Sequence, residues 1–95
     1  MLPWRVELGS DAERALHRLR GDEVQRMKRA IDTLEADPRR AGKAVKAIQG
    51  KRDRFLRFRV GDRRILYEID DDRKVVIVEA IVHRKDLDRW LNSRR

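Results

Sequence analysis

Residues 54–69 carry the pattern of a β-hairpin with a defined register. Apolar and polar residues alternate through most of 54–60, which is the period of a half-buried strand, and residues 64–69 are expected to form the return strand. Gly61 and Asp62 between them fit a two-residue turn with glycine first, the type II′ arrangement. Because a slip of one residue would move every side chain to the opposite face, this turn determines which side chains lie together.

In this register the two strands have faces of opposite character. One face is apolar and suits packing under helices, and it carries Leu56, Phe58, Ile65 and Tyr67. The other face carries Arg57, Arg59 and Arg64, with Arg59 directly opposite Arg64. Like charges in opposite positions destabilise a sheet by roughly a few tenths of a kcal/mol or more, and a bound anion would turn that repulsion into attraction. The alternative is an exposed polar face whose arginines extend into water at little cost.

The segments before this hairpin predict a strand and two helices. Residues 4–8 alternate as a strand, and apolar residues recur at helical spacing over 10–20 and 22–36. Pro38 ends the second helix. Residues 38–53 are basic and contain glycines, so we expect a loop there, with a short helical or packed segment within it.

The segments after the hairpin complete the fold. The β-branched run over 75–82 is apolar on both faces, which indicates a strand inside the sheet, and 86–92 predicts a short helix. We therefore expect one α+β domain over residues 1–95. Its N-terminal strand and helical hairpin pack on a mainly antiparallel four-stranded sheet, followed by a short C-terminal helix.

Several classes of protein are excluded by composition. The chain has no cysteine, so disulfides, thiolate zinc sites and cysteine nucleophiles are absent. No apolar run is long enough to span a bilayer, and the N-terminus lacks the apolar core of a signal peptide. We expect a cytoplasmic protein with no membrane partner, no cofactor and no metal. The acidic run at 70–72 is read as a β-turn rather than a metal site, because it lacks the spacing of a calcium loop.

The positive charge of the chain is concentrated in one segment. The net charge is +8, and residues 38–64 hold 11 basic but only 2 acidic residues. Such a local excess suits a polyanion, because each Lys or Arg near a phosphate releases a condensed counterion. Pairing with acidic helices or with an acidic partner protein is the alternative. The candidate nucleic-acid-binding residues are Lys51, Arg52, Arg54, Arg57, Arg59 and Lys85.

Three residues are candidates for catalysis. Arg64 and Arg84 can hold a scissile phosphate and stabilise the extra negative charge of the transition state. His83 titrates near neutrality and can act as a general acid or base, although a hydrogen bond at the strand end is the slightly favoured alternative. A site of this kind cleaves RNA without a metal, with the 2′-hydroxyl as internal nucleophile.

The motifs of the C-terminal half resemble those of the RelE/ParE toxin superfamily. They are Phe-Arg-Val-Gly-Asp-Arg-Arg-Ile-Leu-Tyr-Glu-Ile at 58–69, the apolar strand at 75–81, and His-Arg-Lys-Asp-Leu at 83–87. The resemblance covers essentially the whole chain. It implies a type II toxin of a bacterium or archaeon, bound and neutralised by a cognate antitoxin, with operator DNA contacted only through the toxin–antitoxin complex.

The resemblance implies two activities and specific residues for them. RelE-like members cleave mRNA on the ribosome, and ParE-like members poison DNA gyrase. Arg64 matches the arginine implicated in transition-state stabilisation, and Arg84 and Arg57 match further basic positions. Phe55 stands where RelE-like nucleases often carry a basic residue, and Asp88 and Trp90 are nearest to their C-terminal tyrosine. We expect an mRNA endonuclease; a gyrase inhibitor, favoured by the missing tyrosine, and an inactive toxin that still binds antitoxin are the alternatives.

Overall fold

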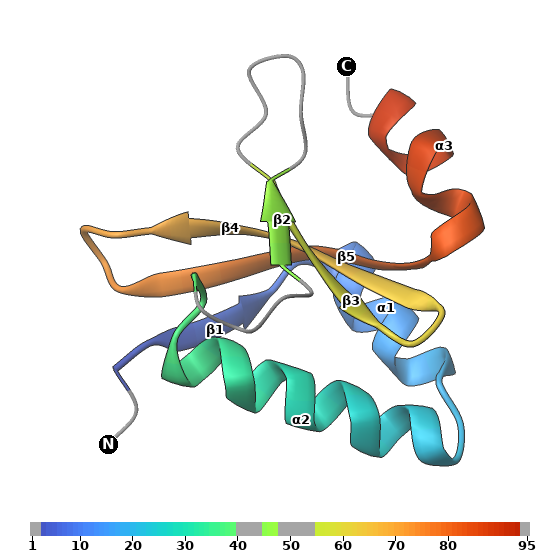
Figure 1. The fold of residues 1–95 in the computed structure, drawn as a ribbon, viewed down its shortest axis with the longest axis horizontal. Helices are drawn as coiled ribbons and strands as arrows, with labels where there is room; N and C mark the ends of the chain where they lie inside the picture. The colour runs from blue at the N-terminus through green and yellow to red at the C-terminus, as the bar shows by residue number, and fades with distance from the viewer. Residues whose placement is uncertain (1–2, 40–44, 48–54, 94–95) are drawn as a thin grey trace.

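The computed structural model describes residues 3–39, 45–47 and 55–93. These residues form a five-stranded sheet with helices on both faces (Figure 1). The elements, in chain order, are β1 (Arg5–Leu8), α1 (Ser10–Arg18), α2 (Asp22–Ala36), β2 (Val45–Ala47), β3 (Leu56–Val60), β4 (Arg63–Asp70), β5 (Val75–His83), a 3₁₀ turn (Arg84–Asp86) and α3 (Leu87–Asn92). The α+β fold class and all the helices and strands expected from the sequence are confirmed.

The strands lie in the order β1-β5-β4-β3-β2. β1 pairs with β5 in parallel, and every other pair is antiparallel. β5 therefore lies inside the sheet, as its apolar run predicted. The fifth strand, β2, falls in the segment expected to be a loop: Val45 pairs with Phe58 and Ala47 with Leu56. The sequence signal was missed because β2 has only 3 residues, too short a run to indicate a strand, and it forms by pairing with the edge of β3.

The predicted register of the β3–β4 hairpin is confirmed at every pair, from Leu56 opposite Tyr67 to Val60 opposite Arg63. Gly61 has φ +60°, whereas Asp62 does not have a positive φ. A type I′ turn needs positive φ at both central residues and a type II′ turn only at the first, so this turn is type II′.

One extra residue on β5 changes which side chains face the helices. Leu66 pairs with Ala80 but Tyr67 pairs with Val78, which leaves Glu79 as a bulge. Because the bulge interrupts the alternation, Val78 and Ile81 both face the main core while Ala80 faces the opposite side. β5 contributes to a core on each face of the sheet, which is why its sequence is apolar on both faces.

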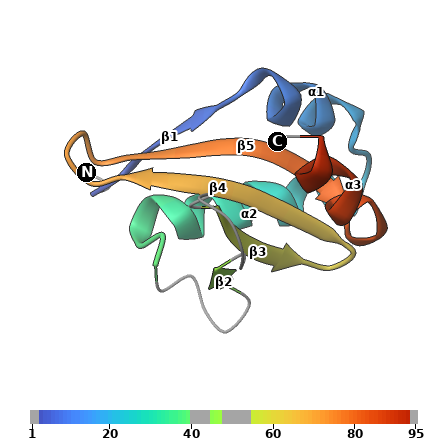
Figure 2. The same cartoon turned by 90° about the horizontal axis from the view of Figure 1, so that it is seen from above.

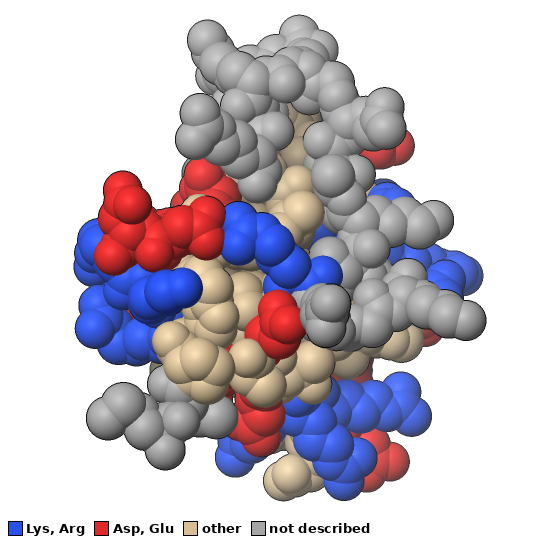
Figure 3. Space-filling view, turned by 60° about the vertical axis from the view of Figure 1, so that its left-hand side comes forward, with Lys and Arg blue, Asp and Glu red and all other residues tan. Residues whose placement is uncertain are grey.

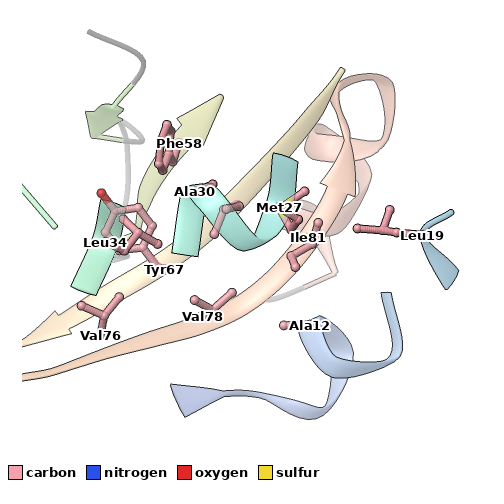
Figure 4. Close-up of a cluster of buried hydrophobic side chains, with 11 residues drawn as sticks. Ala12, Leu19, Met27, Ala30, Leu34, Phe58, Tyr67, Val76, Val78 and Ile81 are labelled. Carbon is pink, nitrogen blue, oxygen red and sulfur yellow. The ribbon is translucent and has the colours of Figure 1, made fainter. Parts of the chain in front are cut away.

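The main core lies between the sheet and the two N-terminal helices. α1 packs against β5 and β1, and α2 crosses the same face from β1 to β3, behind the strands in the view from above (Figure 2). Both helices contribute buried side chains, among them Ala12, Leu19, Met27, Ala30 and Leu34 (Figure 4). The helix pair thus covers one face of the sheet, as the sequence predicted.

A hydrogen bond ties the end of α2 to the sheet within this core. The hydroxyl of the fully buried Tyr67 donates to the backbone carbonyl of Pro38 at 2.6 Å. Burial raises the pKa of Tyr67, so this hydroxyl stays protonated and keeps its donor. The bond holds the point where the chain leaves α2.

Replacement of Tyr67 by phenylalanine is expected to lower the free energy of unfolding by about 1–3 kcal/mol, because the Pro38 carbonyl loses its buried donor. Urea unfolding followed by circular dichroism measures the change. Phe58→Leu, a change of volume without loss of a hydrogen bond, serves as the comparison. An unchanged unfolding midpoint for Tyr67→Phe would contradict the proposed contribution of the bond.

A second, smaller core lies on the other face of the sheet. Leu66, Ala80 and Leu87 are buried there, with Val82, Trp90 and Leu91 packed around them. α3 therefore covers β4 and β5 on the face opposite α2 (Figure 1). The predicted C-terminal helix is confirmed.

Candidate nucleic-acid interface

An arginine cluster occupies the sheet face that carries α3, beside the second core. The hairpin register sets Arg59 opposite Arg64 and Arg57 opposite Leu66, so all three arginines share the face of Leu66. Arg84 joins them from the turn after β5. We call Arg57, Arg59, Arg64 and Arg84 the arginine cluster.

Arg64 is the best-fixed member of the cluster. Its Nη1 donates to the backbone carbonyls of Gly61 at 3.1 Å and of Arg63 at 2.9 Å. Burial lowers the pKa of Arg64, and the positive charges of Arg57, Arg59 and Arg84 lower it further. The guanidinium groups therefore repel one another at Arg64, and an anion bound among them would relieve that repulsion.

Arg84 is placed by the tip of the hairpin. Its backbone N–H donates to the carbonyl of Asp62 at 2.8 Å, and its Nε lies 3.8 Å from Asp62 Oδ1. The tip of β3–β4 and the end of β5 are therefore joined through backbone and side chain together. The sequence predicted Asp62 only as a turn residue, and its contact with Arg84 was missed. The signal that could have found it is that Asp62 is one of 2 acidic residues in the basic segment 38–64.

His83 lies on the other face of the sheet from Arg64. It pairs with Arg63, two positions along from the Ile65–Ile81 pair that faces the main core. Its Nδ1 accepts the backbone N–H of Lys85 at 3.2 Å, which is the strand-end hydrogen bond named as the favoured alternative. This geometry gives His83 a capping role and speaks against its acting as the general base at the arginine cluster.

The remaining candidate residues divide into two groups. Lys85 is exposed in the turn after β5. Lys51, Arg52 and Arg54 lie outside the described residues.

The two positions that depart from the RelE-like pattern are in contact with each other. The rings of Phe55 and Trp90 lie edge to face, with centroids 5.4 Å apart and planes at 74°. Phe55 is buried at the start of β3, and Trp90 comes from α3. An apolar pair therefore occupies the positions where the RelE-like pattern leads one to expect a basic residue and a tyrosine. Phe55 lies two residues before Arg57 in the sequence.

The acidic run at 70–72 lies in the β4–β5 turn and is engaged by basic residues. Arg39 donates to both carboxylate oxygens of Asp71, at 2.8 and 2.9 Å, and Arg73 donates its N–H to Asp70. Basic and acidic side chains intermingle on this side of the molecule (Figure 3). Within residues 3–39, 45–47 and 55–93, no three His, Asp or Glu side chains are grouped so as to hold a metal ion.

The Arg39–Asp71 pair predicts a dependence of stability on pH. The hydrogen bonds from Arg39 lower the pKa of Asp71 below its ordinary value of about 3.9. The pair therefore stabilises the fold above about pH 4, and this stabilisation is lost as the pH falls through the lowered pKa. Thermal unfolding of the wild type and of Asp71→Asn should differ at pH 7 and converge near pH 2. A difference that stays constant over this range would contradict the prediction.

No helix of the described segments is both long and apolar enough to cross a membrane.

Solved structures with this fold come from toxin–antitoxin systems. A chain of the archaeal RelE–RelB complex from Pyrococcus horikoshii is 27% identical with a TM-score of 0.75, and the match covers 87% of this chain and 97% of that one. A chain of the RelBE2 complex from Mycobacterium tuberculosis is 25% identical with a TM-score of 0.62, over 86% and 99% of the two chains. The isolated E. coli RelE toxin shares the fold, with a TM-score of 0.66 at 18% identity over 84% and 83%.

The sequence itself also matches a family model. No curated protein matches it closely enough to be reported as a relative. Residues 6–88, which include the buried residues of both cores and the arginine cluster, match the model of the ParE toxin of the type II toxin–antitoxin system parDE. The chain therefore belongs to the ParE toxin family, within the RelE/ParE superfamily of type II toxins.

Proposed function

We propose that this toxin is a ribosome-dependent mRNA endonuclease that cleaves RNA without a metal ion. The observation that supports this most is the arginine cluster, with Arg64 held by two backbone carbonyls amid the positive charges of its neighbours. Guanidinium groups on an open sheet face suit the phosphates of an extended single strand.

The members of the cluster have different parts in the proposed reaction. The 2′-hydroxyl gives its proton to water as its oxygen attacks the adjacent phosphorus, the bond to the 5′-oxygen breaks, and that oxygen takes a proton from water. The products are a 2′,3′-cyclic phosphate and a 5′-hydroxyl end. Arg64 and Arg84 stabilise the charge that builds on the phosphate oxygens. Arg57 and Arg59 bind neighbouring phosphates and hold the strand in line. The ribosome, as the larger partner, presents the mRNA to this shallow surface.

The protein partner in this proposal is a cognate antitoxin. Chains similar to this one were solved in complexes with RelB in Pyrococcus horikoshii and Mycobacterium tuberculosis. We propose that an antitoxin binds this toxin in the same way and that only the complex contacts operator DNA.

A gyrase inhibitor is the second candidate, and the Phe55–Trp90 contact favours it. This pair supplies neither the positive charge nor the hydroxyl expected of a RelE-like nuclease. The ParE description of the matching family model points the same way.

One experiment separates these functions. The toxin is induced without antitoxin, RNA 5′ ends are mapped across the transcriptome, and purified toxin is added to DNA gyrase in a supercoiling assay. An mRNA endonuclease arrests growth, cuts within translated reading frames and leaves supercoiling unchanged. Growth arrest with intact mRNA and inhibited supercoiling would replace the proposal with the gyrase inhibitor. Growth at the normal rate would mean an inactive toxin.

A further inference from the structure

Asp62 places a carboxylate beside the arginine cluster. Among the described residues it is the one acidic group that raises the pKa of Arg64, whereas Arg57, Arg59 and Arg84 lower it. Its Oδ1 lies 3.8 Å from Arg84 Nε. In the free toxin this carboxylate therefore stands where the cluster would otherwise hold only like charges.

The contact between Asp62 and Arg84 has a permanent part and an exchangeable part. The backbone hydrogen bond from Arg84 to Asp62, at 2.8 Å, belongs to the framework of the fold. The ion pair does not, because the two side chains are 65% and 68% exposed and such pairs contribute little stability in water. The carboxylate can leave Arg84 while the backbone stays in place.

A phosphate is the better partner for Arg84. Its oxygens accept two parallel hydrogen bonds from a guanidinium, and the cluster supplies further guanidinium groups that a single carboxylate does not satisfy. We propose that Asp62 is an exchangeable counter-ion, which holds Arg84 beside Arg64 in the free toxin and gives Arg84 up to an RNA phosphate. Asp62 is then a positioning residue. The proposal rests on the proposed function for its substrate, single-stranded RNA.

This role has two effects of opposite sign. Asp62 keeps Arg84 oriented before substrate arrives, which favours the chemical step. Its negative charge also repels the incoming phosphate, which weakens binding. A residue that only shaped the turn would change neither quantity when replaced by asparagine, since asparagine keeps the size and is accepted in such turns.

The test is Asp62→Asn, compared with Asp32→Asn on the exposed side of α2, which changes the net charge equally. Affinity is measured with a short 2′-O-methyl RNA, which lacks the attacking hydroxyl. Turnover is measured on mRNA bound to ribosomes. We expect Asp62→Asn to bind the RNA about two- to fivefold tighter and to turn over about three- to tenfold slower, while Asp32→Asn matches the wild type in both.

Arg84→Ala shows whether Asp62 acts through Arg84. In that background, Asp62→Asn should no longer slow turnover but should still tighten binding. Unchanged or weaker RNA binding by a folded Asp62→Asn protein would overturn the proposal, as would equal slowing with and without Arg84. If the wild type cuts no mRNA, the proposed nuclease fails, whereas the binding comparison still decides whether Asp62 competes with phosphate.

Discussion

Arg64→Ala is expected to reduce cleavage of ribosome-bound mRNA by about 100- to 1000-fold, which is what the loss of one preorganised group at a developing oxyanion costs. The guanidinium of Arg64 is set in place before substrate arrives, because Nη1 bonds two carbonyls of the hairpin. Alanine removes both the charge and this preorganisation. Cleavage is measured by primer extension on mRNA bound to purified ribosomes.

Arg14→Ala is the matched control for this prediction. Arg14 is an exposed arginine of α1 that pairs with Asp11, away from the arginine cluster. The Arg14→Ala variant should cleave mRNA at the rate of the wild type. Arg64→Lys should stay strongly impaired, because an ammonium keeps the charge but loses the planar, multi-donor guanidinium that Nη1 anchors to the two carbonyls. Full cleavage by a folded Arg64→Ala protein would remove Arg64 from the site.

Leu66→Ala is expected to lower the free energy of unfolding by about 2–5 kcal/mol, the largest stability change predicted for this chain. Leu66 is fully buried in the second core, which is small: Ala80 and Leu87 are its other buried members among the described residues. So small a core has few neighbours that can move into the vacated space. Urea unfolding at neutral pH measures the loss.

Leu91→Ala provides the comparison for Leu66. Leu91 packs at the rim of the same core and is only partly buried, so its truncation should cost less. If both variants lose the same free energy of unfolding, the buried position of Leu66 gives it no greater part than Leu91 in holding α3 on the sheet. An unchanged midpoint for Leu66→Ala would contradict the second core altogether.

The sequence predicted the hairpin well because its register depends on local chemistry. Glycine before Asp62 selects the turn, the turn fixes the pairing, and the pairing places Arg59 opposite Arg64 without any distant contact. The main core, between the helix pair and the apolar face of the hairpin, followed from periodicity in the same way. The charge count located the basic segment, although Lys51, Arg52 and Arg54 lie outside the described residues.

Other features depend on contacts that periodicity does not contain. The bulge at Glu79 determines which face of the sheet each later residue of β5 occupies. Because β5 is apolar on both faces, its sequence does not show the position of the bulge. His83 could not be placed relative to Arg64 without it. The contact of Phe55 with Trp90 joins distant segments, so each position looked like a separate departure from the RelE-like pattern.

The parallel pairing of β1 with β5 has a consequence for synthesis of the toxin. The strand Arg5–Leu8 pairs in the sheet with Val75–Val78, which lie about 70 residues later in the chain and leave the ribosome correspondingly later. Long-range pairing of this kind delays folding until the late segment is available. Arg84, which follows β5, emerges later still. The nascent chain therefore lacks both the finished sheet and the complete arginine cluster until β5 and Arg84 have left the ribosome, and it has no proposed activity before then.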